Sequence, residues 1–559
     1  MSACLSASRF AIPLRALAAS VIWAASLIQV QSVRATTCES LTTLSLPNTT
    51  IATAQIIPTG TFIPPPSPYG SEAPPANYKN IPAFCRVAAE IRPSPDSSIK
   101  IEVWMPVTGW NGRYQGLGNG GFAGSIGYSE LGDAVRRGYA TGGTDTGHWG
   151  RDGDSAWALG HPEKVIDFGY RAIHEMTLKA KTIIRAFYGK SPDHSYFVGC
   201  SDGGREGLME AQRFPDDYDG IVTGAPANYW THLLAGAMWV VQATASDPAS
   251  YIPASKIPAI SAAALAACDA QDGLKDGILN DPSHCHFNPD TLLCKKNDAH
   301  DCLTAPQVAA LKKIYAGPRD SAGHPIFPGY MPGGEEGPGG WALWIIGGNE
   351  PGRALAVANN APGRSVLSIM GAGYFSHMVY EGADWNPKSF NLDRGVKDAD
   401  AKTAGVLNAI DPNLRAFKAR GGKAIIFHGW SDPSIPPLNS IDYYNSVVTK
   451  MGKHETDSFL RLFMVPGMQH CEGGPGPDSF GQDGMPAPED PDHNIYTAIE
   501  RWVEKNEAPS RIIATKYVDD SNPTKGVRMT RPLCPYPQVA KYKGSGGTDD
   551  ALNFVCTKE

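Results

Sequence analysis

A short stretch near the middle of the chain, residues 194–214, is the strongest constraint on the fold. "HSYFVG" (194–199) is a short run of apolar and aromatic residues, which predicts a buried strand, and "GREGLMEAQRF" (204–214) predicts a helix. Between them lies a G-x-S-x-G pattern centred on Ser201. Its small residues permit a tight turn that lifts the serine above a sheet. A strand, a tight turn and a helix in succession are typical of an α/β architecture.

The regions on both sides extend this α/β pattern. From Cys38 to about Trp230 the chain alternates strand-like segments such as "IKIEVWMPV" with helix-like segments such as "VIDFGYRAIHEMTLKAKTIIRAFYG". The alternation fades after residue 230 and resumes at "KAIIFHGWSD" and "SFLRLFMVPGMQHC". Alternating strands and helices imply a parallel sheet covered on both faces. We therefore predict one α/β domain, formed by residues 36–230 and 406–559, with an irregular, cysteine-rich lid domain inserted at 231–405.

The first 35 residues have the pattern of a secretory signal peptide. Arg9 and Arg15 precede an apolar run, 16–30, and a small-residue cleavage pattern ends at Ala35. A membrane anchor is the alternative, but the run is short for a spanning helix of about 20 residues. No comparably long apolar run is apparent later in the sequence. We therefore expect residues 1–35 to be removed, and a secreted or periplasmic protein with no membrane association in its mature form.

Charge and cysteine content limit the possible partners. The net charge is −7 and no long run of lysine or arginine occurs, which argues against nucleic acids and anionic membranes and favours a small or neutral ligand. Of the 11 cysteines, only Cys4 falls within the predicted signal peptide. The even number that remains predicts a disulfide framework in an exported protein. A zinc site is the competing use, but the chain contains no C-x-x-C pair.

The G-x-S-x-G serine needs a base and an orienting group before it can act as a nucleophile. In α/β-hydrolases these partners follow the serine in the order acid, then histidine, on loops after later strands. Asp432 follows the strand-like "AIIFHG", and His470 follows "FLRLFMV". The order predicts a catalytic triad of Ser201, Asp432 and His470.

Other histidines fit the role of the base less well. His428 lies at a strand end and is better explained as a structural residue. His148 and His194 precede Ser201, against the expected order, and His493 begins a helix-like segment.

Two cysteines are the direct neighbours of the predicted nucleophile and base. If Ser201 and His470 come within hydrogen-bonding reach, Cys200 and Cys471 also come close. A disulfide requires Cα atoms within about 7 Å, which is plausible for such neighbours. We therefore predict that this disulfide joins the turn of the nucleophile to the loop of the histidine. The alternative, that Cys200 is the nucleophile, is disfavoured because the turn exposes its central residue, Ser201.

An ester hydrolase also needs two donors for the oxyanion of its tetrahedral intermediate. One is the backbone N–H of Asp202, and the second should come from an earlier glycine-rich loop. "GLGNGGFAG" (116–124) fits this loop, with Gly120 or Gly121 as the donor. The spacing leaves the choice between the two glycines open, and an ordinary flexible loop is the alternative.

An acidic segment within the insertion is a candidate cation site. In "CDAQDGLKDGILND" the carboxylates of Asp269, Asp272 and Asp276 recur within eight residues, and Gly273 and Gly277 indicate a loop. Clustered carboxylates repel one another unless a cation offsets them, and calcium prefers oxygen ligands. The spacing does not match an EF-hand. On spacing alone, a solvated acidic turn explains the segment equally well.

Eight motifs in a fixed order give the chain a resemblance to a known family. They resemble those of the tannase and feruloyl esterase family, which also includes mono(hydroxyethyl) terephthalate hydrolase, over essentially the whole mature chain. The motifs are "FCRVAAEI", "GNGGFAG", "GTDTGH", "GCSDGGREGL", "PDDYDGIVTGAPA", "CDAQDGLKDGI", "HGWSD" and "HC". The resemblance implies an α/β-hydrolase fold with a large inserted lid, and it assigns catalytic roles to Ser201, Asp432 and His470.

The same resemblance implies disulfides and a metal. The family's characteristic disulfide beside the catalytic serine and histidine maps onto Cys200 and Cys471. Sequence proximity and the resemblance together predict the remaining pairs, which are Cys38–Cys85, Cys268–Cys285, Cys294–Cys302 and Cys534–Cys556. The family's structural calcium maps onto the side chains of Asp269, Asp272 and Asp276 and onto the carbonyls of Leu274 and Ile278. Such an ion would stiffen the lid rather than act on substrate.

We therefore expect a serine esterase that cleaves carboxylic esters of aromatic, hydroxycinnamic acids, either small or linked to a plant polymer. Tannase activity on galloyl esters and hydrolysis of terephthalate-type monoesters are alternatives. A non-catalytic, calcium-dependent carbohydrate-binding protein is an alternative of another class, which the complete serine, acid and histidine set disfavours. The sequence does not reveal acyl specificity. Tyr374, Phe375, His377 and Trp385 suit the lid core and the pocket wall equally well.

Overall fold

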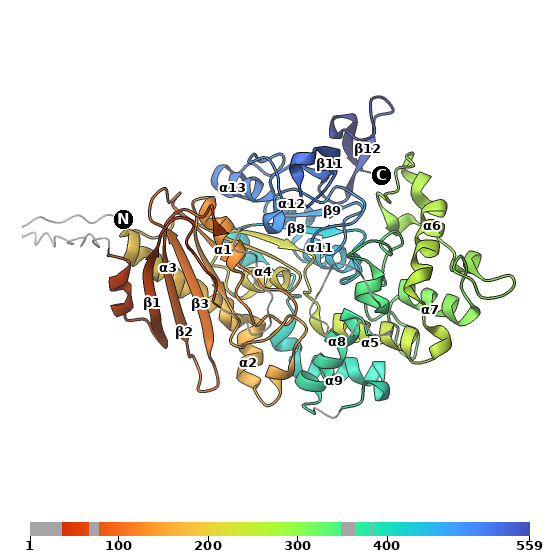
Figure 1. Cartoon of the computed structure of the whole chain (residues 1–559), viewed down its shortest axis with the longest axis horizontal. Coiled ribbons are helices and arrows are strands. Elements are labelled where there is room, and N and C mark those ends of the chain that lie inside the picture. The colour runs from red at the N-terminus through yellow and green to blue at the C-terminus, as the bar shows by residue number, and fades with distance from the viewer. Residues whose placement is uncertain (1–35, 66–77, 348–363, 383–384, 559) are drawn as a thin grey trace, which may run out of the picture.

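A computed structural model describes residues 36–65, 78–347, 364–382 and 385–558 (Figure 1). The predicted signal peptide, 1–35, lies outside the described residues. A nine-stranded sheet with the strand order β1-β2-β3-β5-β4-β6-β7-β8-β9 forms the centre of the fold. Its strands are β1 (Thr49–Ile57), β2 (Phe84–Ile91), β3 (Ile99–Pro106), β4 (Arg113–Leu117), β5 (Ala140–Thr144), β6 (His194–Cys200), β7 (Gly220–Gly224), β8 (Lys423–Gly429) and β9 (Leu460–Val465).

The sheet is mixed, so the prediction of a parallel sheet holds only in part. Strands β5, β4, β6, β7, β8 and β9 are parallel, as predicted. Strands β1, β2 and β3 pair antiparallel with one another, and β3 pairs antiparallel with β5. A parallel pair needs a crossover of a dozen or more residues. The segment between β2 and β3, residues 92–98, is too short for one, so these two strands form a hairpin.

Helices cover both faces of the sheet. On one face lie α3 (Ala172–Tyr188), α4 (Asp202–Arg213) and α11 (Leu438–Met451), and on the other lie α1 (Tyr128–Arg136) and α13 (Ile495–Lys505). The strands alternate accordingly: Phe197, Ile221 and Ile426 pack with the first group, whereas Val198, Val222 and Ile425 pack with the second. Short helices α2 (Pro162–Ile166), α10 (Arg415–Ala419) and α12 (Lys453–Asp457) complete this part.

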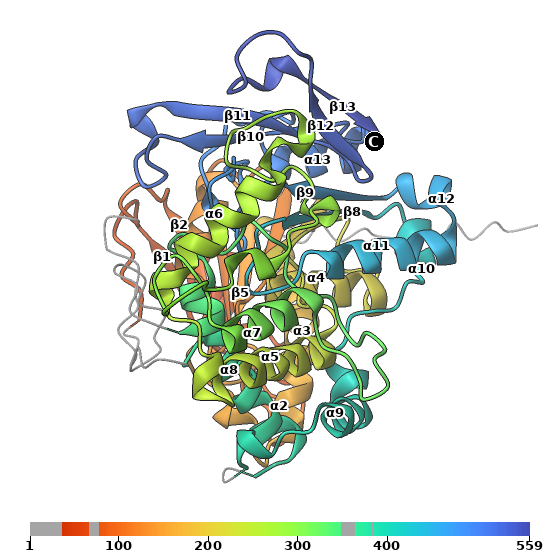
Figure 2. The ribbon, with the colours of Figure 1, turned by 90° about the vertical axis from the view of Figure 1, so that its right-hand side faces the viewer.

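The described residues between β7 and α10 consist of helices and loops and contain no strand beyond isolated bridges. Their helices are α5 (Trp230–Ala245), α6 (Ile257–Cys268), α7 (Ala305–Ala316), α8 (Val366–Tyr374) and α9 (Leu392–Leu407). They bury clusters of their own, and in Figure 2 α5, α7 and α8 lie together facing the viewer. The helical insertion lies where the sequence predicts a lid, although the domain boundaries at 231 and 405 stay a prediction.

One helical run in the described residues, Pro248–Asp272, is long and apolar enough by length and composition to cross a membrane, with a mean hydropathy of 1.2. Sequence inspection overlooked this run. Only its α6 portion, of 12 residues, is α-helix, which is short for a span of about 20 residues. A core helix of a soluble protein passes the same test, so the run is weak evidence for a membrane span.

The C-terminal region adds two small sheets, which lie above β9 in Figure 1. They pair β10 (Ile512–Tyr517) with β11 (Val527–Leu533), and β12 (Gln538–Tyr542) with β13 (Phe554–Lys558). Arg531 of β11 donates to Asp276 of the insertion at 2.7 Å. The end of the chain therefore contacts the acidic loop.

All five predicted disulfides are present, with Cα–Cα distances between 5.0 and 6.0 Å. Cys38–Cys85 fastens the N-terminal turn to β2, and Cys534–Cys556 fastens β13 to the end of β11. Cys268–Cys285 and Cys294–Cys302 lie in the insertion. The predicted disulfide framework is thus confirmed.

Candidate active site

The turn after β6 holds Ser201 in a conformation that few non-glycine residues adopt, with φ 64° and ψ −118°. Two neighbouring glycines allow it. An ideal Cβ on Gly199 would lie 2.8 Å from the backbone of Gly203, and one on Gly203 would lie 2.9 Å from the carbonyl oxygen of Asn119. Side chains at these positions would force the backbones apart. The turn therefore raises Ser201 above the end of β6, as the G-x-S-x-G pattern predicts.

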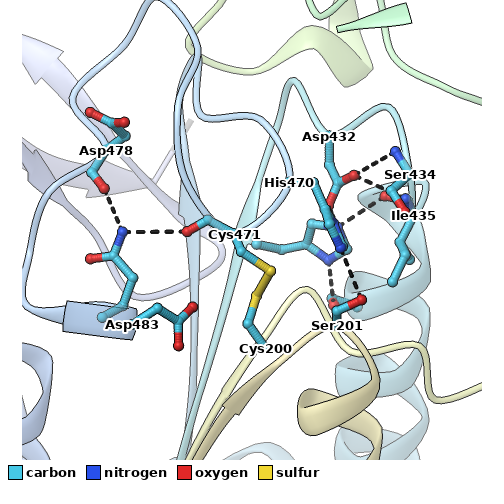
Figure 3. The surroundings of a disulfide bond; sticks show 12 residues. Cys200, Ser201, Asp432, Ser434, Ile435, His470, Cys471, Asp478 and Asp483 are labelled. Atoms are coloured by element: carbon cyan, nitrogen blue, oxygen red, sulfur yellow. Dashed lines mark hydrogen bonds and ion pairs between the residues drawn. A yellow bond between two sulfur atoms is a disulfide. The ribbon is translucent and has the colours of Figure 1, made fainter. Parts of the chain in front are cut away.

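Three side chains from loops after three strands form one hydrogen-bonded chain (Figure 3). His470 Nε2 lies 2.9 Å from Ser201 Oγ, and His470 Nδ1 lies 2.7 Å from Asp432 Oδ2. The other carboxylate oxygen, Asp432 Oδ1, accepts the backbone N–H groups of Ser434 at 2.7 Å and Ile435 at 2.9 Å. The structure thus brings together the three residues that the chain order predicts.

The electrostatics of Asp432 keep its carboxyl ionised. Burial alone would raise its pKa, because the side chain is fully buried. The charge of His470 and hydrogen bonds with His428 and His470 outweigh burial and hold the pKa of Asp432 well below its usual range. His428 is itself fully buried, with Nδ1 2.7 Å from Ser440 Oγ and Nε2 3.2 Å from Asp432 Oδ2. His428 therefore supports the acid, consistent with a structural residue.

The Cys200–Cys471 disulfide joins the two loops directly beside the Ser201–His470 contact, with a Cα–Cα distance of 6.0 Å. Cys471 also has a positive φ of 64°, so both joined loops hold strained backbone next to the contact. The amide of Gln482 donates to the carbonyl oxygen of Cys471 at 3.4 Å. In this structure Cys200 carries no free thiol, which removes the alternative of a cysteine nucleophile.

The glycine-rich loop after β4 is fixed at both ends but open in its middle. Glu206 Oε2 accepts the N–H of Asn119 at 2.8 Å, and Phe122 donates its N–H to the carbonyl oxygen of Asp152 at 2.7 Å. Within the described ranges, the amides of Gly120, Gly121 and Asp202 donate to no protein acceptor. These three N–H groups are therefore available to a ligand. The structure does not select between the two glycines, so that choice stays a prediction.

A cavity of about 1710 Å³ opens at Ser201 and His470. Its wall on the side of the insertion is mostly apolar and comes from α5, α8 and nearby residues: Trp230, Leu233, Leu234, Trp344, Val366, Leu367, Ile369, Met370 and Ile435. The ring centroids of Trp344 and His470 are 5.0 Å apart. Charged residues of α1 and α13, such as Arg136 and Glu500, line another part of the cavity.

The aromatic residues that the sequence offered as pocket candidates do not line this cavity. Tyr374 and Phe375 are fully buried inside the insertion. His377 Nδ1 lies 2.9 Å from Ser155 Oγ, and Trp385 packs against Phe375 and Tyr380. Tyr374, Phe375 and Trp385 therefore belong to the lid core, whereas half-buried His377 contacts a residue outside the insertion. The apolar pattern of α5 and α8 marks both helices as buried, but it does not tell which residues face the cavity.

The acidic loop has part of the geometry of a cation site. Asp272 Oδ1 accepts the N–H of Leu274 at 2.9 Å, and Asp276 Oδ1 accepts the N–H of Ile278 at 3.1 Å. The carbonyls of Leu274 and Ile278 accept no hydrogen bond from the described residues. Burial and the charges of Asp276 and Asp269 raise the pKa of Asp272 to about 6. Negative charge at this loop is therefore only partly offset by Arg531.

The side chains do not converge as a finished metal centre would. In the described part of the chain, these aspartates are absent from the groups of three ligand atoms that lie within 4.8 Å of one another. Arg531 already donates a hydrogen bond to Asp276 Oδ2. The donor set suits calcium in its chemistry, and binding would require the side chains to close around the ion.

A family model described as "Tannase and feruloyl esterase" matches residues 85–557. The chain belongs to the tannase and feruloyl esterase family. An uncharacterized esterase of Xanthomonas campestris is 42% identical over 93% of this chain and 91% of its own length. A probable feruloyl esterase B-2 of Aspergillus flavus is 35% identical over 81% of this chain and 83% of its own length. A mono(2-hydroxyethyl) terephthalate hydrolase of Piscinibacter sakaiensis is 34% identical over 86% of each chain.

The fold comparison agrees with this membership. The crystal structure of feruloyl esterase B from Aspergillus oryzae superposes with a TM-score of 0.82 at 29% identity, covering 93% of this chain and 99% of that one. The α/β-hydrolase fold and the family resemblance are confirmed. The chain is a carboxylic ester hydrolase of the feruloyl esterase type, and no comparison favours a non-catalytic carbohydrate-binding protein.

Removing the Cys200–Cys471 disulfide should impair both stability and catalysis. We expect the double variant Cys200→Ala with Cys471→Ala to lose about 2–5 kcal/mol of unfolding free energy, because the bond closes a loop of 271 residues. Its kcat should fall by roughly tenfold or more, because a small misplacement of the reacting groups is costly. Denaturant unfolding and kcat per active serine would measure the two effects.

The matched control removes the Cys294–Cys302 disulfide, whose separation is only eight residues. Its kcat should stay at the wild-type value. Equal losses of kcat in both double variants, or none in the first, would show that the bond beside Ser201 does not hold the reacting groups in place.

Proposed function

We propose that this protein is an exported serine esterase that hydrolyses carboxylic esters of aromatic, hydroxycinnamic acids, with feruloyl esters as its preferred class. The observation that carries this proposal is that His470 Nε2 lies 2.9 Å from Ser201 Oγ and that both residues line a cavity whose wall on the side of the insertion is mostly apolar and partly aromatic. Such a cavity suits a planar acyl group, because burying apolar surface contributes about 25 cal/mol per Å².

In the first step, Ser201 Oγ attacks the ester carbonyl carbon while His470 Nε2 takes the hydroxyl proton. The carboxylate of Asp432 accepts the Nδ1–H of His470, which fixes the tautomer and stabilises the imidazolium. The carbonyl oxygen becomes an oxyanion. It accepts hydrogen bonds from the N–H of Asp202 and from that of Gly120 or Gly121.

Collapse of this intermediate breaks the bond to the alcohol, which leaves with the proton from His470 Nε2. The acyl group remains on Ser201 as an ester. Water, deprotonated by the same nitrogen, then attacks the acyl carbon, and a second tetrahedral intermediate releases the carboxylic acid and returns the proton to Ser201.

The cavity wall supports the ranking of acyl groups. A feruloyl group is largely apolar and matches the side chains of α5 and α8. A galloyl group carries three hydroxyls that need polar partners when buried. A terephthaloyl monoester carries a carboxylate, and Arg364 lines the same cavity. A monoester of this type is therefore the second candidate, and Arg364 is the observation that favours it.

Export fits the disulfides in the described residues, since such bonds persist in oxidising compartments. A secreted or periplasmic location with cleavage after residue 35 completes the proposal. The substrate would be a small aromatic ester, or one linked to a plant polymer, encountered outside the cytoplasm.

We also propose a structural calcium ion bound by Asp269, Asp272 and Asp276 and by the carbonyls of Leu274 and Ile278. The ion would offset the carboxylate charge at this loop and fasten the insertion. The raised pKa of Asp272 and the free carbonyls support it. No step of ester hydrolysis uses the metal.

The proposed activity predicts a rank order of substrates. Methyl ferulate should have a higher kcat/KM than methyl gallate and mono(2-hydroxyethyl) terephthalate, because the apolar side chains of α5 and α8 favour an apolar acyl group over one that carries hydroxyls or a carboxylate. In Ser201→Ala, hydrolysis of all three should fall by roughly 10⁴-fold or more, with the fold intact by circular dichroism. Initial rates on the three esters would measure both effects.

Two results would contradict these assignments separately. Near-wild-type turnover by folded Ser201→Ala would refute the serine mechanism. A terephthaloyl or galloyl ester with the highest kcat/KM, lost in Ser201→Ala, would refute the acyl preference and leave the mechanism standing. Arg364→Gln then tests the second candidate, because only the terephthaloyl ester needs that cation.

Calcium binding predicts a metal-dependent melting temperature. Chelation should lower the melting temperature by several degrees, because a ligand bound only by the native state stabilises it by mass action. Asp272→Asn should lower it similarly and make it insensitive to added calcium. Asp301→Asn, an exposed carboxylate of the same insertion, is the control and should respond to calcium as the wild type does. A chelator-insensitive wild type would leave this loop as a solvated acidic turn.

A further inference from the structure

The loop that presents Gly120 and Gly121 is held through Asn119. The N–H of Asn119 donates to Glu206 Oε2 at 2.8 Å, and its carbonyl oxygen accepts the N–H of Gly203 at 2.6 Å. Its side-chain amide donates to the carbonyls of Ser125 and Thr144 at 3.0 and 2.9 Å. Both of these backbone hydrogen bonds therefore join Asn119 to α4, the helix that begins directly after the nucleophile.

Among the described residues, Glu206 supplies the one side-chain partner in the two hydrogen bonds that the Asn119 backbone makes. It lies one helical turn after Asp202, on the same face of α4, and is 1% exposed. The loop approaches the helix so closely that an ideal Cβ on Gly118 would lie 2.6 Å from Gly203 Cα and 3.1 Å from Glu206 Oε2. The backbone of the loop therefore packs directly against the backbone of α4, and the Glu206 carboxyl lies beside this contact as a hydrogen-bond acceptor.

The amide of Asp202 is anchored by different contacts of the same helical turn. Its carboxylate accepts from Arg205 Nε at 2.6 Å, and both side chains are fully buried. The guanidinium of Arg205 also donates to the carbonyls of Gly169 at 2.7 Å and Phe168 at 3.1 Å. The first turn of α4 thus holds both sides of the oxyanion hole, Asp202 through Arg205 and the glycine loop through Glu206.

We propose that Glu206 is a positioning residue of the oxyanion hole, whose Oε2 sets the amides of Gly120 and Gly121 relative to the amide of Asp202. The inference rests on the serine mechanism proposed above. Donors in an oxyanion hole act on charge that develops only in the transition state. A displaced loop should therefore lower kcat and leave KM nearly unchanged.

The direction of the pKa shift of Glu206 suits this role. Burial and the nearby charge of Asp202 raise the pKa of Glu206 well above its usual range, although Arg205 and the Asn119 amide act in the opposite direction. A neutral carboxyl accepts the Asn119 N–H without placing a negative charge behind the developing oxyanion. Glutamine, which is neutral and keeps a carbonyl oxygen at the same distance, should replace it.

Three variants test the proposal, with kcat and KM measured on methyl ferulate and active serines counted by fluorophosphonate titration. Glu206→Met removes the acceptor at similar volume and should lower kcat roughly 10- to 100-fold, with KM within about twofold. Glu206→Gln should keep kcat within about threefold of the wild type. The matched control is Glu210→Met, another α4 glutamate that is 1% exposed but has no hydrogen bond to the loop among the described residues, and it should keep its kcat.

An inhibitor comparison separates positioning from general loosening. A trifluoromethyl ketone, which forms an oxyanion on the serine, should bind Glu206→Met more weakly in proportion to the lost kcat, whereas ferulate should bind as it does to the wild type. Wild-type kcat in Glu206→Met, or equal losses in Glu206→Met and Glu206→Gln, would overturn the proposal. An equal loss in Glu210→Met would also overturn it.

If Glu206→Met does not fold, the kcat of Glu206→Asp tests the proposal instead. Its carboxyl is one methylene too short to reach Asn119, so the same loss of kcat is expected, and a wild-type kcat would overturn the proposal. Failure of the serine mechanism gives a different result, because the fluorophosphonate would then label a residue other than Ser201.

Discussion

The hydrogen bond between Ser201 and His470 joins residues 269 positions apart, and the rest of the site is arranged around it. Parallel strands make this contact possible. Since β6, β8 and β9 run in the same direction, the residues that follow them emerge at one edge of the sheet. Ser201, Asp432 and His470 each come directly after one of these strands. The Cys200–Cys471 disulfide then fixes covalently what the sheet brings close.

Much of this site could be predicted from the sequence because its determinants are local. The G-x-S-x-G turn depends on glycines within four residues, and chain order together with positions after predicted strands indicated the acid and the base. The position of Cys200 and Cys471 beside the reacting pair then predicted the disulfide. The antiparallel direction of β1 to β3 was not predicted, because alternation indicates strands but not their direction. For β2 and β3, the connection 92–98 indicates the direction, because it is too short for a parallel crossover.

The residues that bind the acyl group could not be predicted, for a physical reason. Helical periodicity shows that a side chain is removed from water but not whether protein or substrate covers it. Phe375 and Met370 both lie on apolar helical segments, yet Phe375 packs inside the insertion and Met370 lines the cavity. Glu206 was missed for a related reason. Adjacent charges such as Arg205 and Glu206 usually mark a solvated helix face, whereas α4 is buried on nearly all sides.

The most direct test of this account is to trap the acyl-enzyme and map it without reducing the disulfides. An activated ester such as 4-nitrophenyl ferulate, quenched with acid during turnover, should accumulate the intermediate. Peptide mass spectrometry should then find the feruloyl group on Ser201, in a peptide joined through Cys200 to the peptide that contains His470 and Cys471. An acyl group on another residue, or Cys200 joined to a different cysteine, would contradict the account.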